Sequence, residues 1–232
     1  MKAMILAAGH GTRMRPLTDH TPKPLLHVGG KPLIVWHIEK LKYAGFQDIV
    51  INIAWLGDQI PKALGDGSQF DVNLHYSDEQ QDGALETAGG IIKALPLLTQ
   101  TTDQSLKDET FLVVNGDVWC DFNYSTENPL KADDLAHLVL VNNPAHNPEG
   151  DFSLDKNQVA ESGKNKFTFS GIGYYHPALF NKLPQGVRPL APLLRKTMQL
   201  NKVSGELFTG DWRDIGTPER LEQLDFDLRD SH

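Results

Sequence analysis

Short apolar runs alternate along this chain with amphipathic segments, and this alternation is the feature that most restricts how the chain can fold. The apolar runs predict strands at residues 4–6, 49–54, 72–76 and 111–114. The segments between them predict helices at residues 32–44, 59–64 and 89–95. Strands that alternate with helices favour right-handed βαβ units, so we predict an α/β fold with a mostly parallel mixed sheet flanked by helices.

The second half of the chain predicts further strands with shorter connections, at residues 138–141, 152–154 and 167–175. These strands would extend the sheet in a mixed arrangement. No Ser/Gly/Pro-rich stretch divides the chain, so we expect residues 1–232 to form a single domain. Ligands of such sheets bind outside the carboxyl ends of the strands, where the turn at Gly9 and the side chain of Asp117 are expected.

Basic residues gather at the N-terminus of a chain whose net charge is −8. In residues 1–31 the only acidic residue is Asp19, against the basic residues Lys2, Arg13, Arg15, Lys23 and Lys31. A locally basic loop on an acidic protein suits a small anion better than the long phosphate lattice of DNA or RNA. We therefore expect no nucleic-acid partner.

Cysteine content and hydropathy restrict the location of the protein. Cys120 is the only cysteine, which rules out an intramolecular disulfide, fits a reducing compartment and favours a structural role for this thiol. No apolar run approaches the ~20 residues of a membrane span, and residues 4–8 are shorter than the apolar region of a signal peptide. We expect a cytoplasmic protein without a membrane partner.

The turn after the first strand has residue types that suit phosphate groups. Gly9 and Gly11 allow backbone conformations that a Cβ would forbid, so amide N–H groups can face phosphate oxygens. Arg13 adds a fixed fork of donors. Met14 occupies the last glycine position of a dinucleotide fingerprint, and a Walker loop is absent. The turn therefore predicts a phosphate site of another kind.

Lys23 lies between two prolines, which makes its backbone stiff before any ligand arrives. Pro24 pushes Lys23 toward an extended conformation, and Pro22 restricts the residue that precedes it. The ammonium group would thus reach a ligand with little backbone ordering cost.

Longer motifs accompany this loop along nearly the whole chain. They are Gly9-x-Gly11-Thr12-Arg13-Met14-x-Pro16, Pro22-Lys23-Pro24-Leu25, Asn115-Gly116-Asp117 and Trp212-Arg213-Asp214-Ile215-Gly216-Thr217-Pro218. In this order they resemble the motifs of the sugar-1-phosphate nucleotidyltransferases. A narrower branch, the N-acetylmuramate α-1-phosphate uridylyltransferases of peptidoglycan recycling in the cell wall, is resembled by Leu85-Glu86-Thr87-Ala88-Gly89-Gly90, Gly150-Asp151-Phe152 and Thr168-Phe169-Ser170-Gly171.

The resemblance implies a Rossmann-like nucleotide-diphospho-sugar transferase fold, with a nucleotide-binding half at about residues 1–118 and a sugar-binding half at about residues 119–232. It also implies a reaction that depends on Mg²⁺. An oxygen of a sugar-1-phosphate attacks the α-phosphorus of UTP, which releases pyrophosphate and forms a UDP-sugar. UTP and the sugar phosphate are then the partners of a monomer or small homo-oligomer.

The chemistry of this reaction gives roles to the charged residues. Like-charge repulsion is the main obstacle when a phosphate monoester meets a triphosphate. Arg13 would offset the charge that grows on pyrophosphate, and Lys23 would lie beside the α-phosphate. Asp117 and Asp214 would share one Mg²⁺, a hard ion that takes one or two carboxylates together with phosphate oxygens and water.

The resemblance also implies a set of nucleotide contacts, at Leu6, Ala8, Gly9, Gly11, Thr12, Arg13, Lys23, Glu79, Gly83 and Gly89. Glu79 stands where the family contacts the nucleobase. An ionised carboxylate only accepts hydrogen bonds, so Glu79 would suit the N3–H of uracil and reject cytosine. It would not separate uracil from thymine or guanine.

On the sugar side, the resemblance implies hydrogen bonds from Asn115 and Asp151 to hydroxyl or acetamido groups, above a strand that contains Gly171. The Glu-Lys-Pro segment common in the glucose-1-phosphate enzymes is missing, and residues 161–166 stand where it is expected. A muramate acceptor carries a lactyl carboxylate, and Arg195 or Lys202 are candidates for its cation.

Other functions remain open from the sequence. The same chemistry could use glucose-1-phosphate with dTTP or UTP, or mannose-1-phosphate with GTP. A different class is a sensor that binds nucleotide sugars without turnover. The presence of Arg13, Lys23, Asp117 and Asp214 favours an enzyme, because a binding module does not need a full set of charge-neutralising groups at the α-phosphate.

Overall fold

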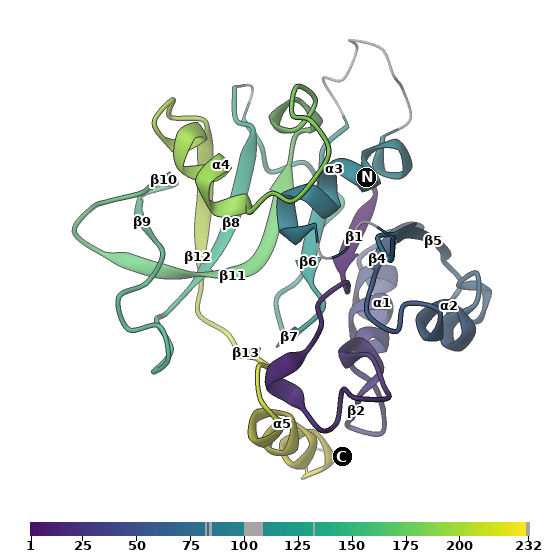
Figure 1. Cartoon of the computed structure of the whole chain (residues 1–232). Coiled ribbons are helices and arrows are strands. Elements are labelled where there is room, and N and C mark those ends of the chain that lie inside the picture. The colour runs from purple at the N-terminus through teal and green to yellow at the C-terminus, as the bar shows by residue number, and fades with distance from the viewer. Residues whose placement is uncertain (82, 84, 100–108, 132, 231–232) are drawn as a thin grey trace.

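The centre of the computed structural model, which describes residues 1–81, 83, 85–99, 109–131 and 133–230, is a nine-stranded sheet. Its strands follow the order β5-β4-β1-β6-β11-β8-β12-β10-β9 (Figure 1). They span Ala3–Leu6 (β1), Asp48–Ile53 (β4), Asn73–Asp78 (β5), Phe111–Asn115 (β6), Ala136–Val141 (β8), Phe152–Asp155 (β9), Gln158–Ala160 (β10), Lys166–Tyr175 (β11) and Val203–Phe208 (β12). Two small sheets pair Val118–Cys120 (β7) with Trp212–Asp214 (β13), and His27–Val28 (β2) with Lys31–Pro32 (β3).

The α-helices of the described residues are Leu33–Tyr43 (α1), Gln59–Leu64 (α2), Glu86–Leu98 (α3), Leu190–Met198 (α4) and Pro218–Asp230 (α5). Each helix predicted between the first strands is therefore present, and α3 is longer than predicted at both ends. Short 3₁₀ turns at Thr12–Met14 and Lys23–Leu25 shape the loop after β1.

The direction of the strands corrects the prediction of a mostly parallel sheet. The neighbours β5, β4, β1 and β6 are all parallel, as expected from their helical connections. In the second half only β8 and β12 are parallel, whereas β11 runs antiparallel to β6, β8 and β9. The connection of β9 to β10 is too short for a crossover helix, so these strands pair as an antiparallel hairpin. The α/β fold thus contains a mixed sheet.

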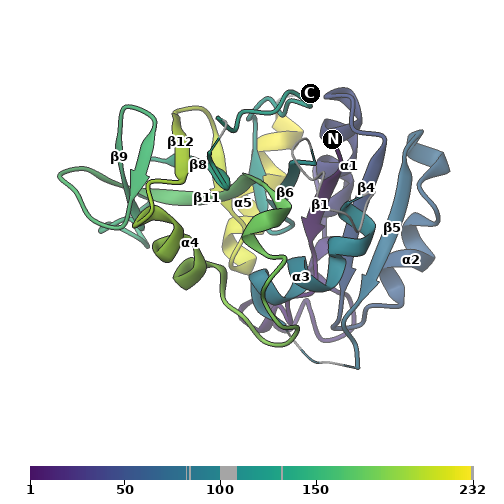
Figure 2. The ribbon, with the colours of Figure 1, turned by 90° about the horizontal axis from the view of Figure 1, so that it is seen from above.

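Helices cover both faces of this sheet. In β1, Ala3 and Ile5 pack with the apolar residues of α1 and α2, whereas Met4 packs with those of α3 and α4. This alternation follows from the two-residue period of a strand. Figure 2 shows α3 and α4 on one side of the row of strands and α1 on the other. With apolar residues on both faces, β1 reads as a continuous apolar run.

The C-terminal helix packs against the loop that follows β1. Ile215, Leu221 and Leu224 form one apolar cluster with Met14 and Leu33. This cluster places the segment around Asp214 beside the N-terminal loop, although the two are about 200 residues apart in sequence. Figure 1 shows α5 next to the loop that follows β1.

Other sequence-based expectations concern Cys120 and the membrane. Cys120 is buried in β7, and burial raises the pKa of its thiol, which agrees with a structural role. No helix among the described residues is long and apolar enough to cross a membrane. The assignment of residues 1–232 to one domain stays a prediction.

Candidate active site

The loop after β1 is closed by contacts of its own. Gly11 has a φ of +60°, and a Cβ at this position would lie 2.9 Å from the Thr18 methyl group. Thr18 Oγ1 donates a hydrogen bond to the Gly11 carbonyl oxygen at 2.8 Å. Only glycine fits this turn without strain, and the turn carries the exposed Arg13 at the middle of the Thr12–Met14 3₁₀ turn.

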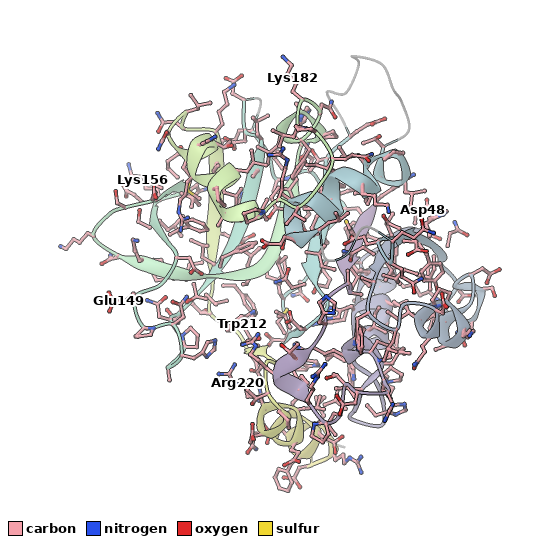
Figure 3. The ribbon with its side chains drawn as sticks, viewed as in Figure 1. Asp48, Glu149, Lys156, Lys182, Trp212 and Arg220 are labelled. Carbon is pink, nitrogen blue, oxygen red and sulfur yellow. The ribbon has the colours of Figure 1, made fainter. Side chains whose placement is uncertain are left out.

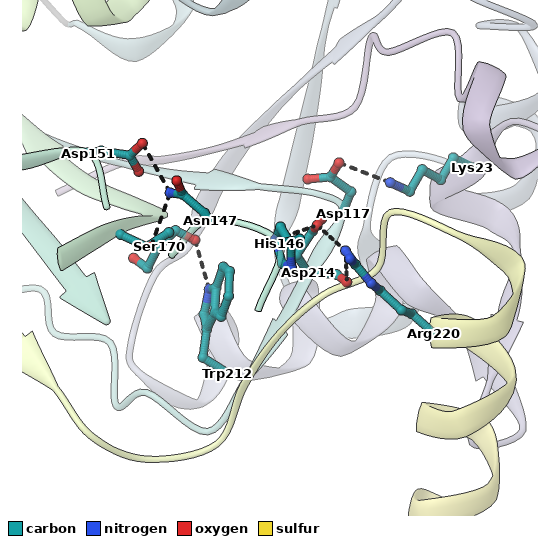
Figure 4. Close-up of polar contacts among 10 residues, drawn as sticks. Lys23, Asp117, His146, Asn147, Asp151, Ser170, Trp212, Asp214 and Arg220 are labelled. Atoms are coloured by element: carbon teal, nitrogen blue, oxygen red, sulfur yellow. Dashed lines mark hydrogen bonds and ion pairs between the residues drawn. The ribbon is translucent and has the colours of Figure 1, made fainter. Parts of the chain in front are cut away.

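Lys23 is the first residue of the second 3₁₀ turn, and its side chain points toward Asp117, just after the end of β6. Its Nζ atom lies 2.9 Å from Asp117 Oδ2, and its side chain is only 10% exposed. The prediction that Lys23 itself is extended is wrong, because Lys23 begins the 3₁₀ turn that contains Pro24, and the extended residue is the preceding Pro22. The ion pair holds the ammonium group and the carboxylate of Asp117 at one place (Figure 4).

The structure brings Asp117 and Asp214 together across a short antiparallel ribbon. Asp214 of β13 pairs with Val118 of β7, and the Ile215 N–H donates to the Asp117 carbonyl oxygen at 2.8 Å. The indole N–H of Trp212 donates to the Ser170 carbonyl oxygen at 2.9 Å, which ties β13 to β11. The two aspartates are therefore neighbours although 97 residues separate them in sequence.

Two residues that sequence reasoning missed contact Asp214. Arg220, in the first turn of α5, donates to Asp214 Oδ2 at 2.6 Å. His146, from the connection between β8 and β9, lies 3.4 Å from the same oxygen. Figure 4 shows both side chains converging on Asp214, and Figure 3 places Arg220 and Trp212 where α5 meets the sheet. No sequence signal identifies His146, whereas Arg220 lies only six residues after Asp214 in the sequence.

Arg13 lies in the same neighbourhood. A Cβ built on Gly216 would be 3.0 Å from Asp214 Oδ2, 3.2 Å from Arg13 Nη1 and 3.3 Å from Arg220 Nη1. Arg220 is thus paired with the carboxylate of Asp214, and the guanidinium group of Arg13 lies near this pair. Cations thus offset the negative charge of both aspartates in this structure.

These residues fit a magnesium ion by the chemistry of their donors. Among the described residues, no group of three or more His, Cys, Asp and Glu side chains is arranged for a metal. Asp117 and Asp214 supply two carboxylates, and a Mg²⁺ ion in phosphate chemistry needs no more than one or two, because phosphate oxygens and water complete its shell. The nearby carboxylate of Asp117 raises the pKa of His37, but burial has the larger effect and lowers this pKa to about 4. His37 therefore adds no positive charge at neutral pH.

A first cavity of about 230 Å³ lies at the carboxyl ends of the strands beside this cluster. Of the predicted residues, it is lined by Leu6, Ala8, Gly9, Lys23, Glu79, Asn115 and Asp117. Gly11, Thr12 and Arg13 do not line it, and Arg13 instead lies beside Asp214. The first cavity also contains Asn52, Glu86 and Thr87, which were not predicted as ligand contacts.

Glu79 is held at the bottom of the first cavity by a buried network. The residue is 1% exposed, and its Oε1 atom accepts a hydrogen bond from Asn52 Nδ2 at 2.7 Å. Asn52 Oδ1 in turn accepts from the Ala7 N–H at 2.8 Å. A Cβ at Gly90 would lie 2.7 Å from Glu79 Oε1, so glycine leaves the space that Glu79 fills. Asn52 therefore orients Glu79, and its place at the end of a strand was the available sequence signal.

The structure does not bring Gly83 and Gly89 into this cavity. The Gly89 N–H donates to the Arg188 carbonyl oxygen at 3.1 Å, and a Cβ at Gly89 would lie 2.4 Å from the Gly186 oxygen. Gly89 thus allows the start of α3 to pack against the segment before α4. Gly83 has a φ of +75° and open space around it, outside the first cavity.

A second cavity of about 310 Å³ adjoins the first, because both are lined by Glu86, Thr87 and Asn115. Glu86 has a φ of +58°, a strained conformation for a residue with a Cβ. Asp151 lines the second cavity, and its Oδ2 atom accepts the Phe169 N–H at 2.8 Å. Its Oδ1 atom accepts from Asn147 Nδ2 at 3.2 Å, as Figure 4 shows. Asp151 therefore organises the cavity wall besides facing the cavity.

Gly171 supports Asn115 from behind. Gly171 has a φ of +81°, and a Cβ there would lie 2.6 Å from Asn115 Nδ2. It does not line the second cavity itself. Its effect on a ligand would therefore act through the position of the Asn115 amide.

We predict that Gly171→Ala raises the KM for the expected sugar-1-phosphate acceptor about 3- to 10-fold, because the new methyl group displaces Asn115 and its hydrogen bonds. Gly30→Ala is the matched control, since Gly30 also has a positive φ (+84°) but no atom within 4 Å of an added Cβ. Because of backbone strain, the free energy of unfolding of both variants should be about 1 kcal/mol lower than that of the wild-type protein. Steady-state kinetics and thermal unfolding measure the two effects, and an equal rise in KM for both variants would contradict the prediction.

The structure distinguishes between Arg195 and Lys202, the two candidate cations for a lactyl carboxylate. Arg195 lines the second cavity. Lys202 lies in the turn before β12 and lines neither cavity. Lys164 and Lys166, which stand where the family has its Glu-Lys-Pro segment, line a separate surface depression with Glu149.

Cations and carboxylates beside a cavity at the carboxyl ends of the strands of an α/β sheet suit an enzyme that acts on the phosphate groups of a nucleotide. Residues 2–152 match the family model described as nucleotidyl transferase, and the chain belongs to this family.

Individual relatives agree with this assignment. The chain is 55% identical over 231 residues to the N-acetylmuramate alpha-1-phosphate uridylyltransferase of Neisseria meningitidis serogroup B, with 96% of each chain covered. It is 32% identical over 238 residues to a mannose-1-phosphate guanyltransferase of Aspergillus oryzae, with 94% of this chain and 62% of the relative covered. A solved structure of a putative glucose-1-phosphate thymidylyltransferase from Bacillus anthracis has the same fold, with a TM-score of 0.81 and 22% identity over 99% of this chain and 96% of that chain.

Proposed function

We propose that this protein is a uridylyltransferase that moves UMP from UTP to N-acetylmuramate α-1-phosphate, which yields UDP-N-acetylmuramate and pyrophosphate for peptidoglycan recycling. The acceptor follows from the 55% identity to the N. meningitidis enzyme over nearly the full length of both chains. The observation that carries the proposal is the convergence of Lys23, Asp117 and Asp214 beside two connected cavities.

In this proposal the first cavity holds the nucleotide and the second holds the acceptor substituents. The acceptor phosphate then meets the α-phosphate of UTP between Lys23, which lines the first cavity, and Asn115, which lines both cavities. Lys23 offsets the charge of the two phosphates, and Arg13 offsets the charge of the departing pyrophosphate. A Mg²⁺ ion on Asp117 and Asp214 would supply further charge neutralisation when bound.

The choice of base rests on Glu79. In the first cavity a buried carboxylate oriented by Asn52 would accept the N3–H of uracil. Cytosine presents an acceptor at N3, so the two acceptors would face each other and binding would be weakened. UTP and the activated sugar are intracellular metabolites in this reaction, which gives the cytoplasm as its location.

The experiment that tests this function measures pyrophosphate release from purified protein over a panel of acceptors and nucleotides with Mg²⁺. N-acetylmuramate α-1-phosphate with UTP should be the preferred pair. Preference for glucose-1-phosphate with dTTP or UTP, or for mannose-1-phosphate with GTP, would keep the reaction and replace the substrate. Binding of UTP without pyrophosphate release for any acceptor would identify a nucleotide-sugar sensor instead.

A further inference from the structure

The second cavity combines an apolar wall with a single cation. Phe152, Phe169, Leu190 and Leu194 contribute the apolar side chains. Arg195 is the only basic residue among those that line the second cavity. Glu86 and Asp151 contribute carboxylates to the same cavity. An anionic ligand group would therefore find one favourable position in it, at Arg195.

The guanidinium group of Arg195 is available to a ligand. It lies on α4 with 44% of its side chain exposed, and its Nε atom is 3.2 Å from Glu161 Oε1. Within the described residues this ion pair is the only one that Arg195 makes. Its Nη groups can still form the fork of two parallel donors that matches a carboxylate.

Glu161 keeps this arginine over the cavity without closing it. The ion pair uses the Nε edge of a guanidinium that carries five N–H donors, so a second carboxylate can bind at the other edge. Since both side chains of the pair are about half exposed, the pair itself adds little to stability. Its effect is to restrict the rotamers of Arg195.

We infer that Arg195 binds the lactyl carboxylate of N-acetylmuramate α-1-phosphate and thereby selects this acid acceptor over neutral amino sugars, an inference that rests on the proposed function. The positions agree with the size of the ligand. Lys23 and Asp117 line only the first cavity, Asn115 lines both, and Arg195 lines only the second. An acceptor with its phosphate at Lys23 and its ring at Asn115 extends its 3-substituent toward Arg195.

The apolar residues around Arg195 suit the rest of the same substituent. A lactyl group carries a methyl group beside its carboxylate, and Leu190 and Leu194 of α4 line the cavity on the same helix as Arg195. An apolar wall also strengthens the pairing of the two charges, because it lowers the local dielectric.

The test compares two acceptors, N-acetylmuramate α-1-phosphate and its lactyl carboxamide, which has the same shape without the charge. We expect the wild-type enzyme with Mg²⁺ and UTP to prefer the acid in kcat/KM by about 10- to 100-fold, the range of one charge-assisted hydrogen-bonded pair. Arg195→Gln should lower kcat/KM for the acid by the same factor and leave the amide nearly unchanged. Arg195→Lys should retain part of the preference.

Lys196→Gln is the matched control, because Lys196 is an exposed cation next to Arg195 on α4 that does not line the cavity. This variant should keep the wild-type preference, and calorimetry should give the same UTP affinity for all variants. An unchanged acid-to-amide ratio in Arg195→Gln would overturn the inference. A wild-type ratio near one would overturn it even if the variant failed to fold. Failure of the proposed function looks different, since the wild-type enzyme would then release no pyrophosphate with the muramate acceptor.

Discussion

Asp117→Asn and Asp214→Asn should each lower kcat by about 10³-fold while the fold is retained. In the proposed reaction both carboxylates would hold a Mg²⁺ ion and so help to neutralise the reacting phosphates, and an amide is a much weaker ligand for Mg²⁺. The fold should persist because an Asn oxygen can still accept the hydrogen bond that Lys23 donates to Asp117 or that Arg220 donates to Asp214.

The measurement is pyrophosphate release across a magnesium titration, with circular dichroism as the check on folding. Asp121→Asn serves as the control, because Asp121 follows β7 directly, is exposed and lines neither cavity. Near-normal turnover of the Asp117→Asn, Asp214→Asn double variant at saturating magnesium would reject the site.

Lys23→Met should lower kcat by about 10²- to 10³-fold, the usual cost of removing one preorganised donor from a site of developing charge. Lys23 is 9% exposed and its only ion-pair partner in the described residues is Asp117. Methionine fills a similar volume, and Asp117 is 37% exposed on its side chain, so its unpaired charge can be solvated. Stability should therefore change by less than about 1 kcal/mol.

Lys31→Met tests whether any lost lysine of the N-terminal segment has this effect. Lys31 forms an ion pair with Glu39 and lies over the Trp36 ring, away from both cavities. Its variant should keep wild-type kcat. Pyrophosphate release and chemical denaturation give the two numbers for each variant, and equal losses of kcat would show that Lys23 has no special role.

The local pattern of apolar and polar residues was sufficient to predict most helices and strands of the first half of the chain. The helix at residues 59–64 has the predicted ends, and the strand predicted at 49–54 is Asp48–Ile53. The elements of the second half that were missed include Leu190–Met198 and Val203–Phe208. The latter contains Gly205, which weakens a strand pattern, but a Cβ there would lie 2.6 Å from the Leu138 oxygen. The close approach of β8 is a tertiary contact that no local pattern contains.

In the candidate site, too, some residues were predicted from the sequence and others are evident only in the structure. Motif order placed Lys23, Asp117 and Asp214 in one hypothesis, and the structure brings these residues together. Asn52 and His146 were missed because their neighbours in space are distant in sequence: Asn52 contacts Glu79, and His146 contacts Asp214. The backbone of Gly89 was assigned to the nucleotide, but it is committed to the segment before α4.

The sequence by itself determined the residue types at the strand ends, the stiff loop around Lys23 and the family of the chain, because these depend on spacing between near neighbours and on motif order. Only the tertiary structure decided that cations meet both aspartates, that Asn115 lines both cavities, and that Arg195 rather than Lys202 lines the second one. These contacts join segments that are brought together by the packing of α5 and α4 on the sheet, and packing energies depend on the whole fold rather than on any one segment.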